Sequence, residues 1–272
     1  MASSTPNQDL VFFRDNSLIH DKALESKSSY LSIISHVQGT SPNWLVNSLI
    51  ENAITGTASL INNDLKKVSN RSKVVLISFL HSQDYYIKNC RKNGLDLSND
   101  SNFKFIDCFS DLFIEQIKTP ENAIKEVNGL FDKISKSIID PKTIVFIEAP
   151  EILLYCTDIT SNDLLFNLIK LNKLCRQLFV ISSKDYPQYV DFDSRNPKDA
   201  TYKITDFLIK LFHRSQLNIS LQPLATGRAK DITGSLVVSQ GSIPFDIPQI
   251  HINEKEYIYN ITKDSNVKLY FR

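Results

Sequence analysis

Short apolar runs alternate along this sequence with segments whose apolar residues recur every three or four positions. The run Val74–Leu80 (VVLISFL) is almost entirely apolar, as expected for a central parallel strand that is covered on both faces. After Thr119 and Pro120, by contrast, apolar residues follow the period of an amphipathic helix. We expect Thr119 to cap this helix and Pro120 to be its first residue. The alternation predicts strand–helix units that build a parallel sheet.

The same patterns predict the remaining elements. Further strands are expected at Ser29–Ser35, Phe103–Phe109, Thr143–Ala149 and Gln177–Ser183, and further helices at Asn43–Thr55, Asp84–Arg91, Ser161–Cys175 and Thr201–His213. The C-terminal part predicts four short strands, added antiparallel at the sheet edge, at Leu217–Leu224, Ser235–Ser239, Glu256–Ile261 and Val267–Phe271. No internal repeat or interdomain linker is visible. We therefore predict a single three-layer α/β domain over residues 1–272, with a mostly parallel central sheet.

The loop between the first predicted strand and the next helix, His36–Pro42 (HVQGTSP), stands where nucleotide-binding folds place a phosphate-binding loop. In P-loop ATPases this loop reads G-x-x-x-x-G-K-[ST], with backbone N–H groups around the phosphates and a lysine on the terminal ones. Here the loop has one glycine, and no lysine occurs from Ser28 to Leu65. Its proline has no N–H to offer a phosphate. We interpret the loop as a degenerate P-loop, made of Gly39, Thr40, Ser41 and Pro42. It indicates a structural or regulatory subunit and not an autonomous ATPase.

The bulk composition narrows the class of protein. The chain has 272 residues and a formal net charge of +1, so any RNA binding has to come from a local basic patch or a partner subunit. Its four cysteines are far apart and form no CxxC pair, which is typical of buried free thiols in a reducing compartment. We expect no membrane span and no secretory signal, because no stretch approaches 18 apolar residues and the start MASSTPNQDLVFF lacks a basic n-region.

No catalytic or metal-binding motif stands out. The five histidines are scattered without a Cys/His cluster, and no G-x-S-x-G elbow occurs. The predicted strand Thr143–Ala149 contains Glu148, where P-loop enzymes place a carboxylate for Mg²⁺ or for the attacking water. Without the P-loop lysine and hydroxyl, we favour a structural or loop-capping role for Glu148 over a metal-binding or catalytic one. We predict no catalytic residue, no metal and no cofactor for this chain.

The segment Leu221–Leu236 (LQPLATGRAKDITGSL) is the most distinctive stretch. It predicts a strand, a long turn with two glycines and two basic residues, and a returning strand. One interpretation is a solvated hairpin. The other is a subunit contact, in which Arg228 forks onto a carboxylate or phosphate across an interface. The interface candidates are Gly227, Arg228, Lys230, Asp231 and Gly234.

Basic residues also stand beside aromatic residues in a long predicted surface loop, Lys184–Ala200. Such pairs can hold single-stranded RNA by phosphate contact and stacking. The candidates for RNA contact are Lys184, Tyr186, Arg195 and Lys198. A second basic set consists of Lys66, Lys67, Arg71 and Lys73. Aspartates dilute the first set, so a solvated loop is favoured over RNA binding for either set taken alone.

Five segments of the chain stand out together: Gln8–Ser17 (QDLVFFRDNS), the first strand and loop with the Trp44 helix, Ile144–Leu154 (IVFIEAPEILL), Thr226–Leu236 (TGRAKDITGSL) and Glu256–Arg272 (EYIYNITKDSNVKLYFR). In this order they resemble the Elongator complex protein 6 family of yeasts. The resemblance covers essentially the whole chain in order, and the last two segments are its most specific parts. The middle, Asn62–Lys136, matches only in pattern.

The resemblance implies a RecA-like, P-loop NTPase-like fold without the nucleotide motifs. It implies a non-catalytic subunit that forms a hetero-hexameric ring with Elongator subunits four and five, two copies of each, and this ring joins the larger Elongator assembly. That assembly installs carboxymethyl-type groups on the wobble uridine (U34) of certain tRNAs, with the chemistry in its third subunit. The resemblance further implies that the assembled ring binds tRNA. It also implies a cytoplasmic protein, with the nucleus as a second location.

One alternative of a different class stays open, a RecA-like recombination-mediator paralogue that binds DNA or a recombinase partner. Such paralogues often keep part of a Walker motif, whereas this chain keeps only Gly39. Co-purifying proteins separate the two hypotheses. Two further RecA-like chains of similar size indicate the Elongator ring, and a recombinase filament protein indicates the mediator.

Overall fold

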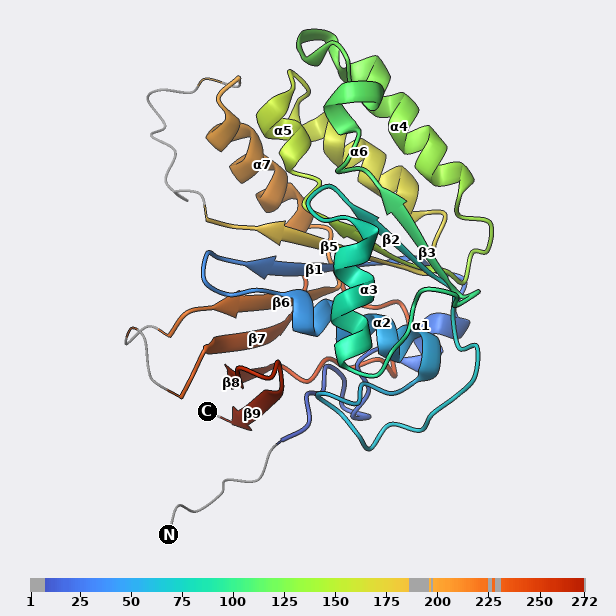
Figure 1. Cartoon of the computed structure of the whole chain (residues 1–272), viewed down its shortest axis with the longest axis vertical. Coiled ribbons are helices and arrows are strands. Elements are labelled where there is room, and N and C mark those ends of the chain that lie inside the picture. The colour runs from blue at the N-terminus through green and yellow to red at the C-terminus, as the bar shows by residue number, and fades with distance from the viewer. Residues whose placement is uncertain (1–7, 186–195, 197, 225–226, 228–230, 272) are drawn as a thin grey trace.

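One sheet of nine strands organises the part of the chain that the structure describes. The computed structural model describes residues 8–185, 196, 198–224, 227 and 231–271. Within them the strands lie in the order β3-β2-β4-β5-β1-β6-β7-β8-β9 (Figure 1). The strands are β1 (Tyr30–His36), β2 (Val74–Ser78), β3 (Phe103–Asp107), β4 (Ile144–Glu148), β5 (Gln177–Ser183), β6 (Leu217–Gln222), β7 (Gly234–Gln240), β8 (Lys255–Ile261) and β9 (Val267–Phe271). The first six pair with one another in parallel, and β7, β8 and β9 extend the sheet by antiparallel pairing.

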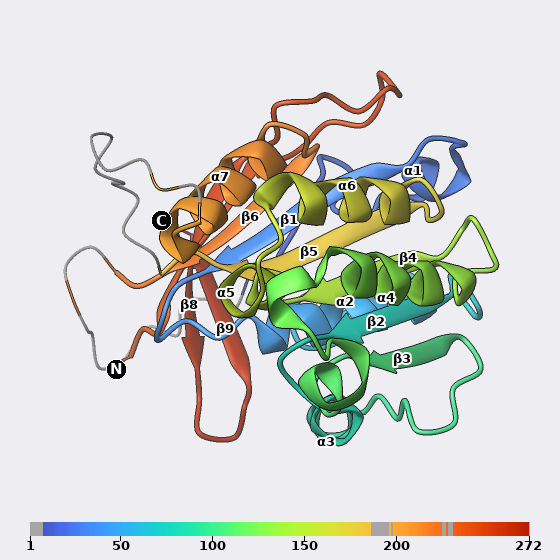
Figure 2. The ribbon, with the colours of Figure 1, turned by 90° about the horizontal axis from the view of Figure 1, so that it is seen from above.

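Helices cover both faces of this sheet and give the molecule three layers. One face carries α1 (Asp21–Glu25), α2 (Asn43–Thr55) and α3 (Gln83–Lys92), and the other carries α4 (Ile124–Lys136), α5 (Ile152–Cys156), α6 (Ser161–Asn172) and α7 (Ala200–Phe212). Figure 2 shows α4, α6 and α7 side by side along the second face. A π-helical turn, Leu112–Gln116, and a 3-10 turn, Pro120–Asn122, lead from β3 to α4. No helix among the described residues is both long and apolar enough to cross a membrane.

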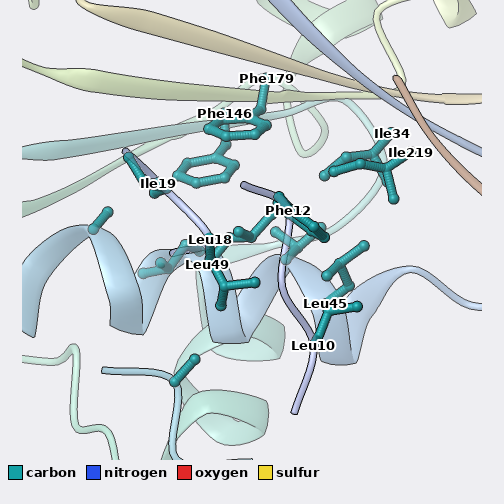
Figure 3. Close-up of a cluster of buried hydrophobic side chains, with 14 of the residues drawn as sticks. Leu10, Phe12, Leu18, Ile19, Ile34, Leu45, Leu49, Phe146, Phe179 and Ile219 are labelled. Atoms are coloured by element: carbon teal, nitrogen blue, oxygen red, sulfur yellow. The ribbon is translucent and has the colours of Figure 1, made fainter. Parts of the chain in front are cut away.

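The central strands are apolar on both sides because both sides are covered. In β2, Leu76 joins the core under α2, and the next residue, Ile77, joins the core under α4 to α7. Phe146 of β4 and Phe179 of β5 are direct cross-strand partners whose stacked rings lie 4.9 Å apart between centroids. Figure 3 shows these two rings facing the helix that carries Leu45. Each fully buried phenylalanine contributes about 1.5–3 kcal/mol relative to an exposed one.

Arg71, from the second predicted basic set, has a structural role. Its guanidinium donates to the Ile19 carbonyl at 2.6 Å and to the Asn52 carbonyl at 3.0 Å, and it pairs with the Asp21 carboxylate. The side chain is only 10% exposed. These contacts tie the long connection after α2 to the N-terminal segment, so this arginine is not available for RNA.

The predicted α/β fold with a mostly parallel sheet is confirmed, and α2, β5 and β9 have the predicted bounds. Two local predictions are wrong. The strand Leu217–Gln222 pairs in parallel with β1, because α7 forms a helical crossover between β5 and β6. Thr119 does not cap α4, which begins at Ile124 after the 3-10 turn. The Thr119 N–H donates to the Glu126 carboxylate instead, at 3.1 Å.

Candidate functional site at the carboxyl ends of the parallel strands

The carboxyl ends of the parallel strands meet along one edge of the sheet, on the left in Figure 1. There β1 ends at His36, β2 at Ser78, β4 at Glu148 and β5 at Ser183. In open α/β sheets, ligands bind in the crevice outside this edge. The loop between β1 and α2, with the residues that follow the other strands, is therefore the candidate site.

The loop Val37–Thr40 is a closed turn. The Thr40 N–H donates to the Val37 carbonyl at 3.0 Å, and the Thr40 hydroxyl donates to the same carbonyl at 2.7 Å. The Val37 N–H in turn donates to the Thr40 hydroxyl oxygen at 3.2 Å. Gly39 has a φ of +86°, a left-handed conformation that glycine adopts without strain. The N–H groups of Val37 and Thr40 are thus used inside the turn.

A carboxylate of the chain itself lies against this turn. The Gln38 N–H donates to Asp185 Oδ1 at 2.5 Å. The second oxygen, Asp185 Oδ2, accepts from the Ser183 hydroxyl at 2.8 Å. A P-loop reserves such backbone N–H groups for the phosphates of a nucleotide. Here the negative charge of Asp185 opposes the approach of a polyphosphate.

The rest of the predicted P-loop forms the entry into α2. The Pro42 carbonyl accepts from the Val46 N–H at 2.9 Å as the helix begins. The Asn43 N–H donates to the Ser41 hydroxyl at 3.4 Å. Thr40 is buried and Ser41 is exposed. The four predicted residues therefore lie in one loop, whose polar groups bond mainly to one another.

Glu148 is buried in a hydrogen-bond network that joins three elements. The Ser78 hydroxyl donates to Oε2 of Glu148, and Nδ1 of His81 lies 3.0 Å from Oε1. The His81 ring stacks on Tyr85 of α3 at 3.9 Å between centroids, and the Tyr85 hydroxyl contacts the Asn43 amide. This network supports the structural role favoured for Glu148. In the described part of the chain, no three His, Cys, Asp or Glu residues are grouped as a metal site requires.

A second carboxyl group, Glu151, is also buried at this edge. Its Oε1 accepts from the Ser183 N–H at 2.9 Å. Burial raises the pKa of Glu151 to about 7, against the lowering effect of that hydrogen bond. Between the two glutamates, Ala149 has a φ of +53°, which is strained for a residue with a side chain. This left-handed residue comes directly after the last residue of β4.

Lys184, a predicted RNA contact, is half-buried at the same edge. Its amine donates to the Ser220 hydroxyl at 2.6 Å, and burial lowers the pKa of Lys184. Its backbone N–H donates to the His36 carbonyl at 2.8 Å. Burial also lowers the pKa of His36, which favours the neutral ring. The amine of Lys184 is thus hydrogen-bonded within the chain, at the carboxyl ends of the parallel strands.

The other predicted contact residues are spread over several places. Tyr186, Arg195, Arg228 and Lys230 lie outside the described residues. Lys198, Gly227 and Asp231 are exposed. Gly234 is buried in β7, where a Cβ atom would lie 2.5 Å from the Gln222 carbonyl oxygen. The RNA-contact and subunit-interface assignments stay predictions.

Sequence reasoning missed Asp185, His81 and Tyr85 as members of this site. Asp185 meets the turn only because β5 pairs with β1, and pairing of distant strands is not visible in local patterns. A signal was present in the sequence: His81 follows directly after one predicted parallel strand, and Asp185 is the second residue after another, where polar side chains gather at one edge.

The comparison with solved structures concerns the fold. The flagellar accessory protein FlaH from Methanocaldococcus jannaschii matches with a TM-score of 0.54, covering 93% of this chain and 95% of FlaH. The two sequences are only 10% identical, so the likeness carries no statement about activity. With the sheet order, it confirms the predicted RecA-like fold class.

The sequence comparison is more specific. No profile of a known protein family matches the chain. Elongator complex protein 6 from Saccharomyces cerevisiae is 32% identical over 280 residues, which cover 99% of this chain and 99% of that protein. The predicted resemblance is thereby confirmed over the full length of both sequences. The chain belongs to the Elongator complex protein 6 family.

Proposed function

We propose that this chain is a non-catalytic subunit of the Elongator complex. With two related RecA-like chains, subunits four and five, it forms a hetero-hexameric ring within the larger assembly. The ring binds tRNA and supports carboxymethyl-type modification of the wobble uridine, U34. The observation that carries the proposal is the 32% identity to Elongator complex protein 6 along the whole chain.

The geometry of the turn supports the non-catalytic part of the proposal. A P-loop needs free N–H groups and a lysine for the phosphates. In this chain the Gln38 N–H is bonded to Asp185, and the residues from Ser28 to Leu65 contain no lysine. The fold of a nucleotide-binding domain thus serves here as a scaffold for assembly.

The cell compartment follows from the same proposal. Modification of the wobble uridine acts on cytoplasmic tRNA, so we place the protein in the cytoplasm, with the nucleus as a second location. Microscopy of the chain fused to a fluorescent protein, expressed from its own promoter, tests this. Exclusion from both compartments would contradict it.

The central experiment is to purify the tagged chain from its own organism. We expect two further RecA-like chains of similar size to co-purify, and the native mass of the isolated ring to correspond to six subunits. Deletion of the gene should remove the carboxymethyl-type groups from U34, measured by mass spectrometry of purified tRNA. A monomeric protein without such partners, or unchanged U34 in the deletion strain, would overturn the proposal.

A further inference from the structure

A row of basic residues follows the amino edge of the sheet. The amino ends of the parallel strands lie at the edge opposite the candidate site (Figure 1). Five strands that are neighbours in the sheet, β2, β4, β5, β1 and β6, are each preceded by an exposed lysine or arginine, one to four residues before the strand begins. In the order of the sheet these residues, which we call the basic row, are Lys73, Lys142, Lys173, Lys27 and Arg214.

Backbone hydrogen bonds place the starts of these strands side by side. The Ile144 N–H donates to the Lys73 carbonyl at 2.9 Å, which joins β4 to β2. The Arg176 N–H donates to the Thr143 carbonyl at 2.9 Å, and the Tyr30 N–H donates to the Arg176 carbonyl at 3.0 Å. Neighbouring strands lie about 4.8 Å apart, so five strand starts span about 20 Å. The basic row is therefore a line of positive charge along the edge of the sheet.

The charges of the basic row are not used within the described part of the chain. None of its five side chains forms an ion pair or a hydrogen bond with another described residue. The last five residues before each of these strands include two acidic side chains, Glu25 and Asp140, and Asp246 reaches the same edge from the loop after β7. Asp140 already accepts from a backbone N–H, and Asp246 from two hydroxyl groups. The edge therefore keeps an excess of positive charge.

A line of unpaired cations is suited to a polyanion with regularly spaced charges. A single phosphate would occupy one or two of these residues, whereas a nucleic-acid strand brings one phosphate per nucleotide along its length. An anionic membrane spreads its headgroups over a plane, and the basic row lies along one line. The opposite edge of the sheet carries the carboxylates of Glu148 and Asp185, so a polyanion is attracted to the amino edge instead.

We propose that the basic row binds the phosphate backbone of an RNA strand, with phosphates of the strand beside the starts of neighbouring strands of the sheet. The inference rests on the proposed binding of tRNA and names the surface of this chain that takes part in it. Of the second basic set predicted from the sequence it uses Lys73 and not Arg71, whose guanidinium is bonded within the chain. Contacts of this kind position the RNA and carry no sequence information.

The salt dependence of binding tests the proposal. Fluorescently labelled tRNA is titrated with the full chain, without its proposed ring partners, at a series of salt concentrations. Each phosphate contact contributes about −0.7 to the slope of log affinity against log salt concentration for a single strand, and about −0.9 for a duplex. Five contacts therefore predict a slope of about −3.5 to −4.5. A free chain that does not bind tRNA even at low salt would overturn the proposal.

A neutral variant tests where the RNA lies. The three central residues of the row are changed together, as Lys142→Gln, Lys173→Gln and Lys27→Gln. We expect the salt slope to become shallower by about 2 to 3, because three phosphate contacts lose their cation. The three side chains are exposed, so the melting temperature should stay close to that of the wild type. An unchanged slope in this folded variant would overturn the proposal.

Three exposed lysines away from the amino edge provide the matched control, Lys125→Gln at the start of α4 with Lys263→Gln and Lys268→Gln in the hairpin of β8 and β9. This variant changes the net charge by the same amount and should keep the wild-type slope. Equal changes of slope in the two variants would overturn the proposal, and so would binding of the chain to phosphatidylserine vesicles in preference to tRNA. Ring assembly and U34 modification are measured separately, so the proposed function can stand when this inference fails.

Discussion

The Gln38 backbone N–H donates to the Asp185 carboxylate, and this contact joins the loop after β1 to the second residue after β5. Loops of this kind bind phosphates because their N–H groups point at an anion brought by the ligand. Here the chain supplies the anion itself. The neighbouring N–H groups of Val37 and Thr40 are bonded within the turn. A polyphosphate would have to displace these contacts without a P-loop lysine, because the nearby Lys184 amine is already bonded to the Ser220 hydroxyl.

We therefore expect the isolated chain not to bind MgATP in calorimetry. A dissociation constant near or below about 10 µM, roughly −7 kcal/mol, would show that the loop binds nucleotide by another route. Asp185→Asn is the control. It removes the charge but supplies no lysine, so it should leave the chain without measurable affinity.

Arg228 gives a prediction about assembly. It lies outside the described residues, between the exposed Gly227 and the β7 strand. If its guanidinium reaches a neighbouring subunit, Arg228→Ala should leave the fold intact and weaken the ring by about 1.5–3 kcal/mol, the size of a charge-assisted hydrogen bond. Sedimentation of the chain co-expressed with its two proposed ring partners measures this.

Arg228→Lys distinguishes a guanidinium contact from a simple charge. An ammonium group cannot reproduce the planar fork of arginine, so the lysine variant should restore assembly only in part. Full restoration of assembly by lysine would indicate that only the positive charge at this position matters. Unchanged assembly in Arg228→Ala would support the other interpretation of this turn, a solvated hairpin.

Gly234 and Gly129 form a matched pair for stability. A Cβ atom at Gly234 would lie 2.5 Å from the Gln222 carbonyl and 3.0 Å from the Tyr259 hydroxyl, whereas one at Gly129 of α4 would meet nothing within 4 Å. We expect Gly234→Ala to lower the free energy of unfolding by about 1–3 kcal/mol through overpacking. Gly129→Ala should raise it by about 0.5–1 kcal/mol, because an alanine has less backbone freedom than a glycine to lose when the helix folds. Urea unfolding of both variants checks the opposite signs.

Elements with a clear apolar period or a continuous apolar run were predictable from the sequence. The helix α2 follows from its apolar period and its proline, and β5 from a continuous apolar run. The five-residue helices α1 and α5 are too short to show a period. The parallel pairing of β6 depends on a crossover through α7, which the alternating burial of this strand does not reveal.

The candidate site was predictable only in part for the same reason. The loop around Gly39 was located by its place between a strand and a helix. The carboxylate of Asp185 reaches it from far along the chain, through the register of β1 and β5. The pairing of Glu148 with His81 likewise depends on where the chain turns after β2. Such contacts belong to the tertiary structure, and the sequence shows only that Asp185 and His81 come soon after predicted strands.

Glu151 makes stability depend on pH. Its pKa is about 7 in the folded chain, against an ordinary value of 4.5, because burial disfavours the charged form. The folded state therefore holds this proton to a higher pH than the unfolded state does. Its contribution is fully present below the ordinary pKa of 4.5 and is lost as the pH rises through about 7. The loss amounts to roughly 3 kcal/mol between those limits.

Glu151→Gln should remove this dependence, because an amide does not ionise. We expect the variant to match the wild type in urea unfolding at acidic pH and to exceed it by up to about 3 kcal/mol above neutral pH. Glu126→Gln is the control of opposite sign: the Thr119 and Lys118 N–H groups lower the pKa of the exposed Glu126 carboxyl, so this variant should lose stability at neutral pH and not at acidic pH. If the difference between Glu151→Gln and the wild type is the same at every pH, Glu151 has the same pKa in the folded and the unfolded chain, which contradicts the raised pKa.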